Sequence, residues 1–443
     1  MVSHGTGGTS TGETSLPMMP RNKPEIMAPA GNWTSLHAAI QAGADAIYFG
    51  LRGFNMRDNS NNFKGPEMAR LARTCRQAGV RAYLALNTII YENEISRVQR
   101  LLDVAASAGI DAVICWDMAV IEAATARGLP VFLSTQMSCA NSASLAAFYR
   151  TFGIRRFVLA RECSLAHIRA IRRKLPRLLG ADAAHIELEV FAHGAMCVSI
   201  SGRCFLSEST AGKSANRGQC TQPCRRAYQI SGSDDATAFR MGDQYLLSPQ
   251  DLCTLPFIEQ LLGAGVNSLK LEGRGRAPEY VGTVTSVYRR AVDFHCAKHR
   301  RPGFQHQFQQ LKDSLMRELD GVYHRGLASG FYMGRPLDQW SGAPNSQAAA
   351  KKLHIGEVVK FYRKAGAAEI RVCDTGFALG DELLIQGPTT GVVRVRVTSI
   401  QIEHQPQPNA RRGQAVAVQL DSPVRRGDRV YRVVSREGES IKF

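Results

Sequence analysis

The sequence predicts an α/β protein, a TIM-type (β/α)8 barrel followed by a small all-β barrel. Between residue 25 and about residue 300, eight short apolar runs alternate with amphipathic stretches of helical periodicity. The runs are almost continuously apolar, as strands are when a parallel sheet is covered on both faces. From residue 353 the pattern changes to alternating apolar and polar residues, which is typical of antiparallel strands.

The eight runs give the expected barrel strands in chain order, and the segments between them give the helices. An open, doubly wound sheet is the alternative, but the count of eight and the absence of a Gly-rich dinucleotide turn favour a closed barrel. Several helical segments end in glycine, a common helix C-cap. The expected strands are residues 25–31, 46–50, 80–87, 111–117, 131–136, 156–162, 185–194 and 268–274.

The spacing of the runs also predicts the domain organisation. About 74 residues separate the seventh run from the eighth, so we expect an insertion at about 195–253. An insertion there lies at the C-terminal face of the barrel, where active sites of this fold form. We expect a flexible tail over 1–23, the barrel over 24–340 and the C-terminal β-barrel over 341–443. The expected C-terminal strands are 354–362, 368–374, 380–387, 392–400, 414–420 and 427–434.

Composition narrows the class of protein. The chain has 443 residues, 44% of them hydrophobic and 21% charged, which excludes global disorder. No apolar run approaches the roughly 18 residues of a membrane span. The net charge of +17 points to a polyanionic partner, nucleic acid first and an anionic membrane surface second. The first 23 residues lack the apolar core of a secretory signal, so we expect a cytoplasmic, reducing environment.

The cysteines suggest a metal centre. The chain has 11 cysteines, an odd number that argues against a disulfide framework. Four of them, Cys197, Cys204, Cys220 and Cys224, fall within 28 residues. Their spacing contains no CxxC pair, which favours an iron–sulfur cluster over zinc and over unligated thiols. Cys253 is a spare candidate ligand.

Polar residues at the ends of the expected strands are the candidate site residues, because barrels carry their chemistry there. Lys270, Glu272 and Arg274 alternate along the last strand and should face one side. They form either a cationic catalytic site or a structural ion-pair layer. His193, four residues before Cys197, is a proton donor, a neighbour of the cluster or a packed imidazole. The candidate catalytic residues are His193, Lys270, Glu272 and Arg274, and the candidate substrate-binding residues are Asn87, Gln136 and Arg161.

Several segments together resemble the collagenase-like peptidase family (U-32). The resemblance covers residues 25–335, and the cysteine-rich segment with KLEGR carries most of its specificity. The C-terminal part is similar to the elongation-factor-like β-barrel of some members. The matching segments are MAPAGNWTSLHAAIQAGADAIYFG, LNTIIYENE, STQMSCAN, FVLARECSL, HGAMCVSISGRCFLS, KSANRGQCTQPCR, LLSPQDL, SLKLEGR and YHRGLASGFYMG.

The resemblance implies RNA hydroxylation. Bacterial members of this family hydroxylate the tRNA wobble uridine to 5-hydroxyuridine, or a cytidine of large-subunit ribosomal RNA. They carry a 4Fe–4S cluster, and prephenate metabolism is linked to the reaction, so a small anionic hydroxyl donor is implied. The four clustered cysteines match the family cysteines. His193, Gly194, Lys270, Glu272, Gly273 and Arg274 match its HG and K-x-EGR motifs.

Three functions stay open on the sequence. An iron–sulfur RNA hydroxylase is the first, with tRNA favoured over ribosomal RNA as substrate. A peptidase, as the family name says, is the second, although the sequence contains no HExxH motif. The third is a non-enzymatic RNA-binding factor in which the cluster is structural.

Overall fold

The computed structural model describes residues 23–228, 245, 247–336, 339–343 and 345–436. The expected tail over 1–23 lies outside these residues, apart from Lys23. Within the described chain, no helix is both long enough and apolar enough to cross a bilayer.

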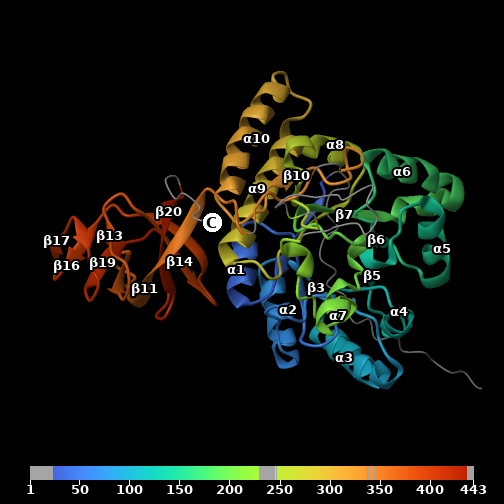
Figure 1. Cartoon of the computed structure of the whole chain (residues 1–443), viewed down its shortest axis with the longest axis horizontal. Coiled ribbons are helices and arrows are strands. Elements are labelled where there is room, and N and C mark those ends of the chain that lie inside the picture. The colour runs from blue at the N-terminus through green and yellow to red at the C-terminus, as the bar shows by residue number, and fades with distance from the viewer. Residues whose placement is uncertain (1–22, 229–244, 246, 337–338, 344, 437–443) are drawn as a thin grey trace, which may run out of the picture.

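Eight parallel strands close into a barrel, which confirms the expected fold (Figure 1). Each strand pairs with the next along the chain, and β9 pairs with both β7 and β1, so the sheet has no free edge within the barrel. The strands are β1 (Glu25–Ala30), β2 (Ala46–Gly50), β3 (Arg81–Ala85), β4 (Ala112–Cys115), β5 (Val131–Leu133), β6 (Arg156–Val158), β7 (Glu187–Gly194) and β9 (Ser268–Leu271).

Helices surround the strands (Figure 1). Several begin at a side-chain cap that satisfies a free backbone N–H group: Asn32 accepts from Ser35 and Asn141 accepts from Ser144. The last of them, α10, packs against α9. The helices are α1 (Trp33–Gln41), α2 (Met68–Gln77), α3 (Ile95–Ala108), α4 (Met118–Thr125), α5 (Ser142–Phe152), α6 (Leu165–Leu179), α8 (Ile258–Gly263), α9 (Pro278–Lys298) and α10 (Phe304–Asp320).

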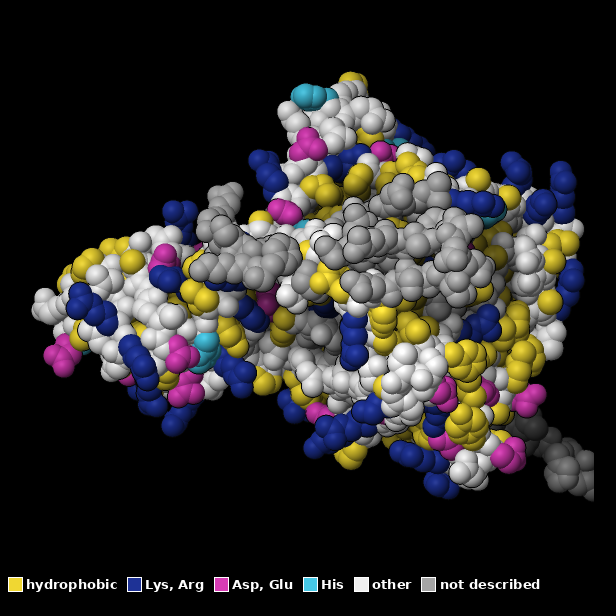
Figure 2. Space-filling view, in the orientation of Figure 1, with side chains coloured by type: hydrophobic (Ala, Val, Ile, Leu, Met, Phe, Trp, Pro, Cys, Tyr) yellow, Lys and Arg dark blue, Asp and Glu magenta, His cyan; other side chains and the backbone are white. Residues whose placement is uncertain are grey.

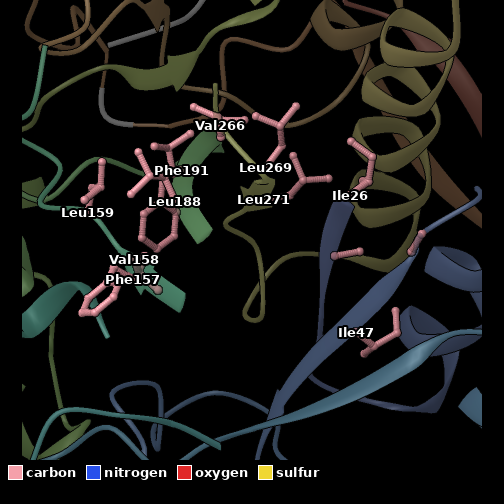
Figure 3. Packing of buried hydrophobic residues seen from close by; sticks show 14 of the residues in the cluster. Ile26, Ile47, Phe157, Val158, Leu159, Leu188, Phe191, Val266, Leu269 and Leu271 are labelled. Carbon is pink, nitrogen blue, oxygen red and sulfur yellow. The ribbon is translucent and has the colours of Figure 1, made fainter. Parts of the chain in front are cut away.

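The main apolar core lies between the strands and these helices. Figure 3 shows four of its members, Ile26, Ile47, Leu188 and Leu269, which come from β1, β2, β7 and β9. Residues of the opposite parity point into the barrel, where the apolar cluster is small and centred on Met27, Tyr48, Tyr83 and Ile114. The rest of the interior is polar and charged.

Charged side chains inside the barrel pair with one another, some of them at its N-terminal end, where the strands begin. Arg156 Nη1 lies 2.6 Å from Glu25 Oε1, and its Nε lies 2.6 Å from Glu187 Oε2. Lys270 Nζ lies 2.8 Å from Glu189 Oε1, and both side chains are almost fully buried. Buried charges are tolerated only when they are paired in this way.

The insertion after β7 lies at the C-terminal end of the barrel. Its described part contains the single-turn segment η5 (Ile200–Gly202), the short helix α7 (Leu206–Ala211) and the strand β8 (Asp251–Cys253). β8 runs antiparallel to the end of β7 and pairs with β10 (Leu327–Ala328), so both strands extend the sheet outside the barrel.

The C-terminal domain is all-β and antiparallel, as expected. Its main sheet has the order β15-β14-β20-β11-β12-β19-β16-β17 and covers its own apolar core. Two further short strands, β13 and β18, pair with each other. The bounds are β11 (Ala350–Tyr362), β12 (Ala367–Val372), β13 (Phe377–Ala378), β14 (Glu382–Gly387), β15 (Gly391–Arg396), β16 (Ile400–Ile402), β17 (Gln405–Pro406), β18 (Asn409–Ala410), β19 (Ala415–Gln419) and β20 (Arg429–Ser435).

Specific polar contacts hold this domain against α1 and α9 of the barrel (Figure 1). Glu279 of α9 accepts a hydrogen bond from Gln386 at 2.7 Å and pairs with Lys352 at 2.8 Å. Gln41 of α1 donates to the carbonyl of Thr390 at 2.8 Å. These contacts fix the two domains side by side.

Candidate active site

A pocket opens at the C-terminal end of the barrel, beneath the insertion. Its empty volume is about 920 Å³, with the open mouth included. Strand ends form its floor, and the insertion forms part of its wall. It joins ten of the sequence-predicted residues: Asn87, Gln136, Arg161, Cys197, Cys204, Cys220, Cys224, Lys270, Glu272 and Arg274.

His193 is the candidate that the structure places elsewhere. The pairing of β7 with β9 shifts register between Phe191 and His193, so His193 lies opposite Leu271 rather than beside Lys270. Its ring is buried against Tyr280 and Tyr288 on the outer side of the barrel. Burial lowers the pKa of His193 to about 4. Of the three readings of this residue, the geometry matches a packed, neutral imidazole.

Glu272 is the anionic centre of the pocket, and its cationic partner comes from a loop. Arg57, between β2 and α2, donates to Glu272 Oε1 through Nε at 3.2 Å and Nη2 at 2.9 Å. Tyr48 Oη donates to Glu272 Oε2 at 3.2 Å. Burial alone would raise the pKa of Glu272, but the charges of Arg57, Arg161 and Arg274 outweigh it and lower the pKa to about 2. Glu272 is therefore ionised.

Lys270 pairs with Glu189, whose carboxylate compensates its charge inside the barrel. Their 2.8 Å pair lies inside the barrel, and the ammonium group also lies 4.6 Å from the centre of the Tyr48 ring. Burial lowers the pKa of Lys270, and the carboxylate of Glu189 opposes that shift. The expected arrangement, in which Lys270 and Arg274 flank Glu272, is thus replaced by two pairs, Lys270 with Glu189 and Arg57 with Glu272.

Arg161 and Arg274 line the pocket without a carboxylate partner among the described residues. Arg274 donates to Asn55 Oδ1 at 3.0 Å, and Arg161 donates to the carbonyl of Ala195 at 3.0 Å. The Nε–H group of each is buried and lacks a hydrogen-bond acceptor in the described chain. Guanidinium groups with free donors are suited to bind a carboxylate or a phosphate.

Asn87 and Gln136 place two amide groups on one wall of the pocket. Asn87 Nδ2 lies 3.4 Å from Gln136 Oε1, which also accepts from the hydroxyl of Ser134. Asn87 Oδ1 accepts from the backbone N–H of Met56 at 3.2 Å. Because an amide carries both donors and acceptors, this wall can bind the polar edge of a heterocyclic base.

The four clustered cysteines of the insertion line the pocket. Backbone N–H groups point at two of the sulfurs: Leu206 donates to Cys204 Sγ at 3.4 Å, and Gln222 donates to Cys220 Sγ at 3.4 Å. Such donors stabilise thiolates bound to a metal centre. No three His, Cys, Asp or Glu side chains in the described residues converge as ligands of one metal ion. The donor set is thus four thiols spread around one cavity.

Cys253 lies apart from these four. It is buried in β8, where its sulfur faces Met316 Sδ at 3.9 Å and Tyr288 Oη at 3.9 Å. It does not line the pocket.

Contacts from several strand-end loops hold the insertion over the barrel. Glu162, after β6, accepts from the backbone N–H of Ser201 at 2.7 Å and from its hydroxyl at 2.9 Å. Arg217 pairs with Glu94, after β3. The loop that carries Arg57 touches the insertion through Asn59, whose N–H donates to the carbonyl of Gly218 at 3.1 Å. The insertion and the Arg57–Glu272 pair are therefore coupled.

We expect Gly218→Ala to break this coupling. Gly218 has φ +79°, and an added Cβ would overlap the carbonyl oxygen of Asn55 and lie 2.8 Å from the backbone nitrogen of Asp58. Gly212, in the same insertion, has φ +62° but open space around it. Gly212→Ala should cost about 1 kcal/mol for the left-handed backbone alone. Gly218→Ala should cost at least about 3 kcal/mol. Urea unfolding of both variants measures the difference, and equal losses would contradict the coupling.

Sequence reasoning did not find Arg57 or Glu189 as site residues. Glu189 carried a signal, because it is an acidic residue flanked by the apolar residues Leu188 and Val190 in the expected strand. Arg57 carried no such signal. It lies in an irregular loop, where no helical or strand periodicity predicts the direction of a side chain.

Comparisons with known proteins show the family of this chain. The family model described as peptidase family U32 matches residues 31–342. A protein of Porphyromonas gingivalis named collagenase is 38% identical over 417 residues, which are 93% of this chain and 98% of that protein. The tRNA hydroxylation protein P1 of Bacillus subtilis is 34% identical over 320 residues, 71% of this chain and 72% of that protein.

A third relative is the Escherichia coli protein named 23S rRNA 5-hydroxycytidine C2501 synthase. It is 33% identical over 338 residues, which are 76% of this chain and 49% of that protein. The family match spans most of the chain, and the relatives are named as enzymes, which confirms the resemblance seen in the motifs. This chain is therefore an enzyme that belongs to peptidase family U32.

Proposed function

We propose that this enzyme hydroxylates a pyrimidine base of RNA. The favoured target is the wobble uridine of tRNA, with 5-hydroxyuridine as the product, and a ribosomal RNA cytidine is the alternative target. Relatives named for tRNA and rRNA hydroxylation support the reaction class. The observation that carries the proposal is that one pocket is lined by four cysteine thiols, by the paired cations Arg57 and Lys270, and by Arg161 and Arg274 with free N–H donors.

We propose that Cys197, Cys204, Cys220 and Cys224 hold a 4Fe–4S cluster. Their thiols line one cavity, and backbone N–H groups already point at two of the sulfurs. A bound cluster would supply electron transfer and Lewis-acid chemistry.

The chain's own residues would bind and orient the two reactants. Chemistry on a base requires that the base leave its stack, and the pocket mouth would receive it in that form. The amides of Asn87 and Gln136 would bind the polar edge of the base. Arg161 and Arg274 would bind a small anionic hydroxyl donor through their free N–H groups, and prephenate is our candidate donor. The base exchanges a C–H bond for a C–O bond, while the donor gives up its hydroxyl group and takes the hydrogen.

The surface charge is suited to an RNA substrate. Figure 2 shows Lys and Arg side chains spread over both the barrel and the C-terminal domain. On α6, Arg173, Lys174 and Arg177 are all exposed. Contacts of such side chains with phosphates release counterions and make binding salt-dependent.

Replacing Cys220 with serine is expected to remove both the iron and the activity. Anaerobically prepared wild type should be brown, with about four iron atoms per chain. Cys220→Ser should lose most of the iron, and a deletion strain that carries it should lack the modified nucleoside in mass spectrometry of its tRNA and ribosomal RNA. The matched control is Cys253→Ser, because that thiol lies outside the pocket. Stoichiometric zinc without iron in the wild type would contradict the cluster.

A second candidate function is peptide hydrolysis. The relative named collagenase aligns over a larger share of both chains than the relatives named for hydroxylation. Against it, none of the described residues that line the pocket is a histidine able to activate a nucleophile. Cleavage of gelatin by the pure enzyme, with no nucleoside lost from the RNA of the deletion strain, would establish this function instead.

A further inference from the structure

Two large apolar side chains near the mouth of the pocket are exposed to solvent. Ile200 is 65% exposed and Phe205 is 74% exposed, which makes them the most exposed large hydrophobic residues in the described chain. Their neighbours Gly202, Cys204 and Leu206 line the pocket. Ile200 and Phe205 therefore lie on the lip of the active site, and we call residues 200–205 the lip.

The lip is held in place by buried contacts. Ser201, which follows Ile200 in the lip, is fully buried. Its backbone has φ +45°, which is unfavourable for serine. Ser201 donates two hydrogen bonds to the Glu162 carboxylate, through its backbone N–H and its hydroxyl, and these hold it in that conformation. Arg203 also donates to the hydroxyl of Ser138 at 3.1 Å. A strained residue pinned beside two exposed apolar side chains costs stability, and such strain collects at ligand-binding sites.

A second exposed ring lies beside the insertion. The backbone N–H of Cys204 donates to Asn216 Oδ1 at 3.3 Å. The next residue, Arg217, lies 4.8 Å from the centre of the Tyr91 ring, and Tyr91 is 55% exposed. Tyr91, on the loop after β3, therefore lies beside the insertion that carries the lip.

The charge around the lip selects the kind of partner. Over residues 195–228, Glu208 is the one acidic residue in the sequence. Arg203, Lys213 and Arg226 are basic and exposed there. Exposed rings within a cationic surface are suited to single-stranded nucleic acid, because bases stack on the rings while cations contact the phosphates.

We propose that Phe205, with Ile200 beside it, is a stacking platform for a base of single-stranded RNA that neighbours the base in the pocket. Arg203 contacts the adjoining phosphate. This inference rests on the proposed function, because it assumes an RNA substrate, and it adds the residues that hold the strand at the mouth.

The test measures binding of a fluorescent twelve-residue oligouridylate to the anaerobically prepared enzyme at several salt concentrations. Phe205→Ala should weaken binding by about fivefold to a hundredfold and leave the salt dependence unchanged, because it removes stacking alone. Phe205→Trp should restore the affinity. Arg203→Gln should instead lower the salt slope by about one. Leu379→Ala is the matched control, since Leu379 is 48% exposed on the C-terminal domain.

The outcomes separate the platform from the proposed function. Wild-type modification of RNA together with unchanged oligouridylate binding by Phe205→Ala overturns the platform and leaves the hydroxylase standing. Absence of RNA binding and of modification in the wild type overturns both. Loss of gelatin binding in Phe205→Ala, without loss of RNA binding, assigns the lip to a peptide and also overturns the platform.

Discussion

Replacing Arg156 with methionine is expected to lower the free energy of unfolding by about 3–5 kcal/mol. Arg156 is the cation at the N-terminal end of the barrel, where it pairs with Glu25 and Glu187 and lies 3.9 Å from Glu189. Glu25 is almost fully buried, so without Arg156 it would remain charged without a counter-ion or would have to take up a proton, whereas Glu189 keeps its pair with Lys270. Thermal and urea unfolding measure the loss.

An exposed pair provides the control for this experiment. Arg127 pairs with Asp103 at 2.6 Å, but the side chain of Asp103 is 59% exposed. Arg127→Met should therefore cost only about 0–1 kcal/mol. Equal losses for the two variants would mean that Arg156 is not the cation that stabilises the barrel interior.

The pH dependence of the Arg156 variant should also be reversed. In the wild type, burial raises the pKa of Glu25, but Arg156 outweighs it and the net pKa lies below 4.5. Glu25 then stabilises the fold above that pH, and the contribution is lost as the pH falls. Without Arg156, burial leaves the pKa of Glu25 raised. The contribution of Glu25 to the stability of the variant should then be present below its ordinary pKa of 4.5 and be lost as the pH rises above that value.

The fold was predictable because its physical cause is local in the sequence. A parallel strand covered on both faces is mostly apolar, so it appears in the sequence as a short apolar run, and all eight such runs became barrel strands. The common face of Lys270, Glu272 and Arg274 followed from strand alternation, and all three line the pocket. The four clustered cysteines line the same pocket, and their role as ligands of one cluster stays a prediction.

The partners of these residues were not predictable, because they depend on closure of the barrel and on loops. Glu189 lies beside Lys270 only because β7 pairs with β9, although the long insertion separates these two strands in the sequence. Arg57 reaches Glu272 from an irregular loop. The direction of His193 is set by a register shift after Phe191, and no residue type in that stretch marks the shift.

The Arg57–Glu272 pair gives the second large expected effect. Glu272→Gln keeps the shape of the side chain but leaves Arg57, Arg161 and Arg274 without their shared anion. We expect the free energy of unfolding to fall by about 3–5 kcal/mol, with loss of iron and of base modification. The pKa of Glu272 is about 2 in the folded protein, against an ordinary value of 4.5, so the wild type loses the stability that this carboxylate contributes as the pH falls from 4.5 to about 2. The difference in stability between the two proteins should therefore shrink as the pH falls through this range.

A double variant separates a structural role of Glu272 from a chemical one. Removing both charges, as Arg57→Gln with Glu272→Gln, eliminates the half-buried cation that the single variant leaves unpaired, so most of the lost stability should return. If Glu272 only holds Arg57 and the insertion in place, iron content and RNA modification should return with it. If Glu272 touches the reactants, the double variant should fold and hold iron but should not modify RNA. Unfolding, iron assay and nucleoside mass spectrometry on one preparation distinguish these results. A stable single variant with full modification would remove Glu272 from the active site.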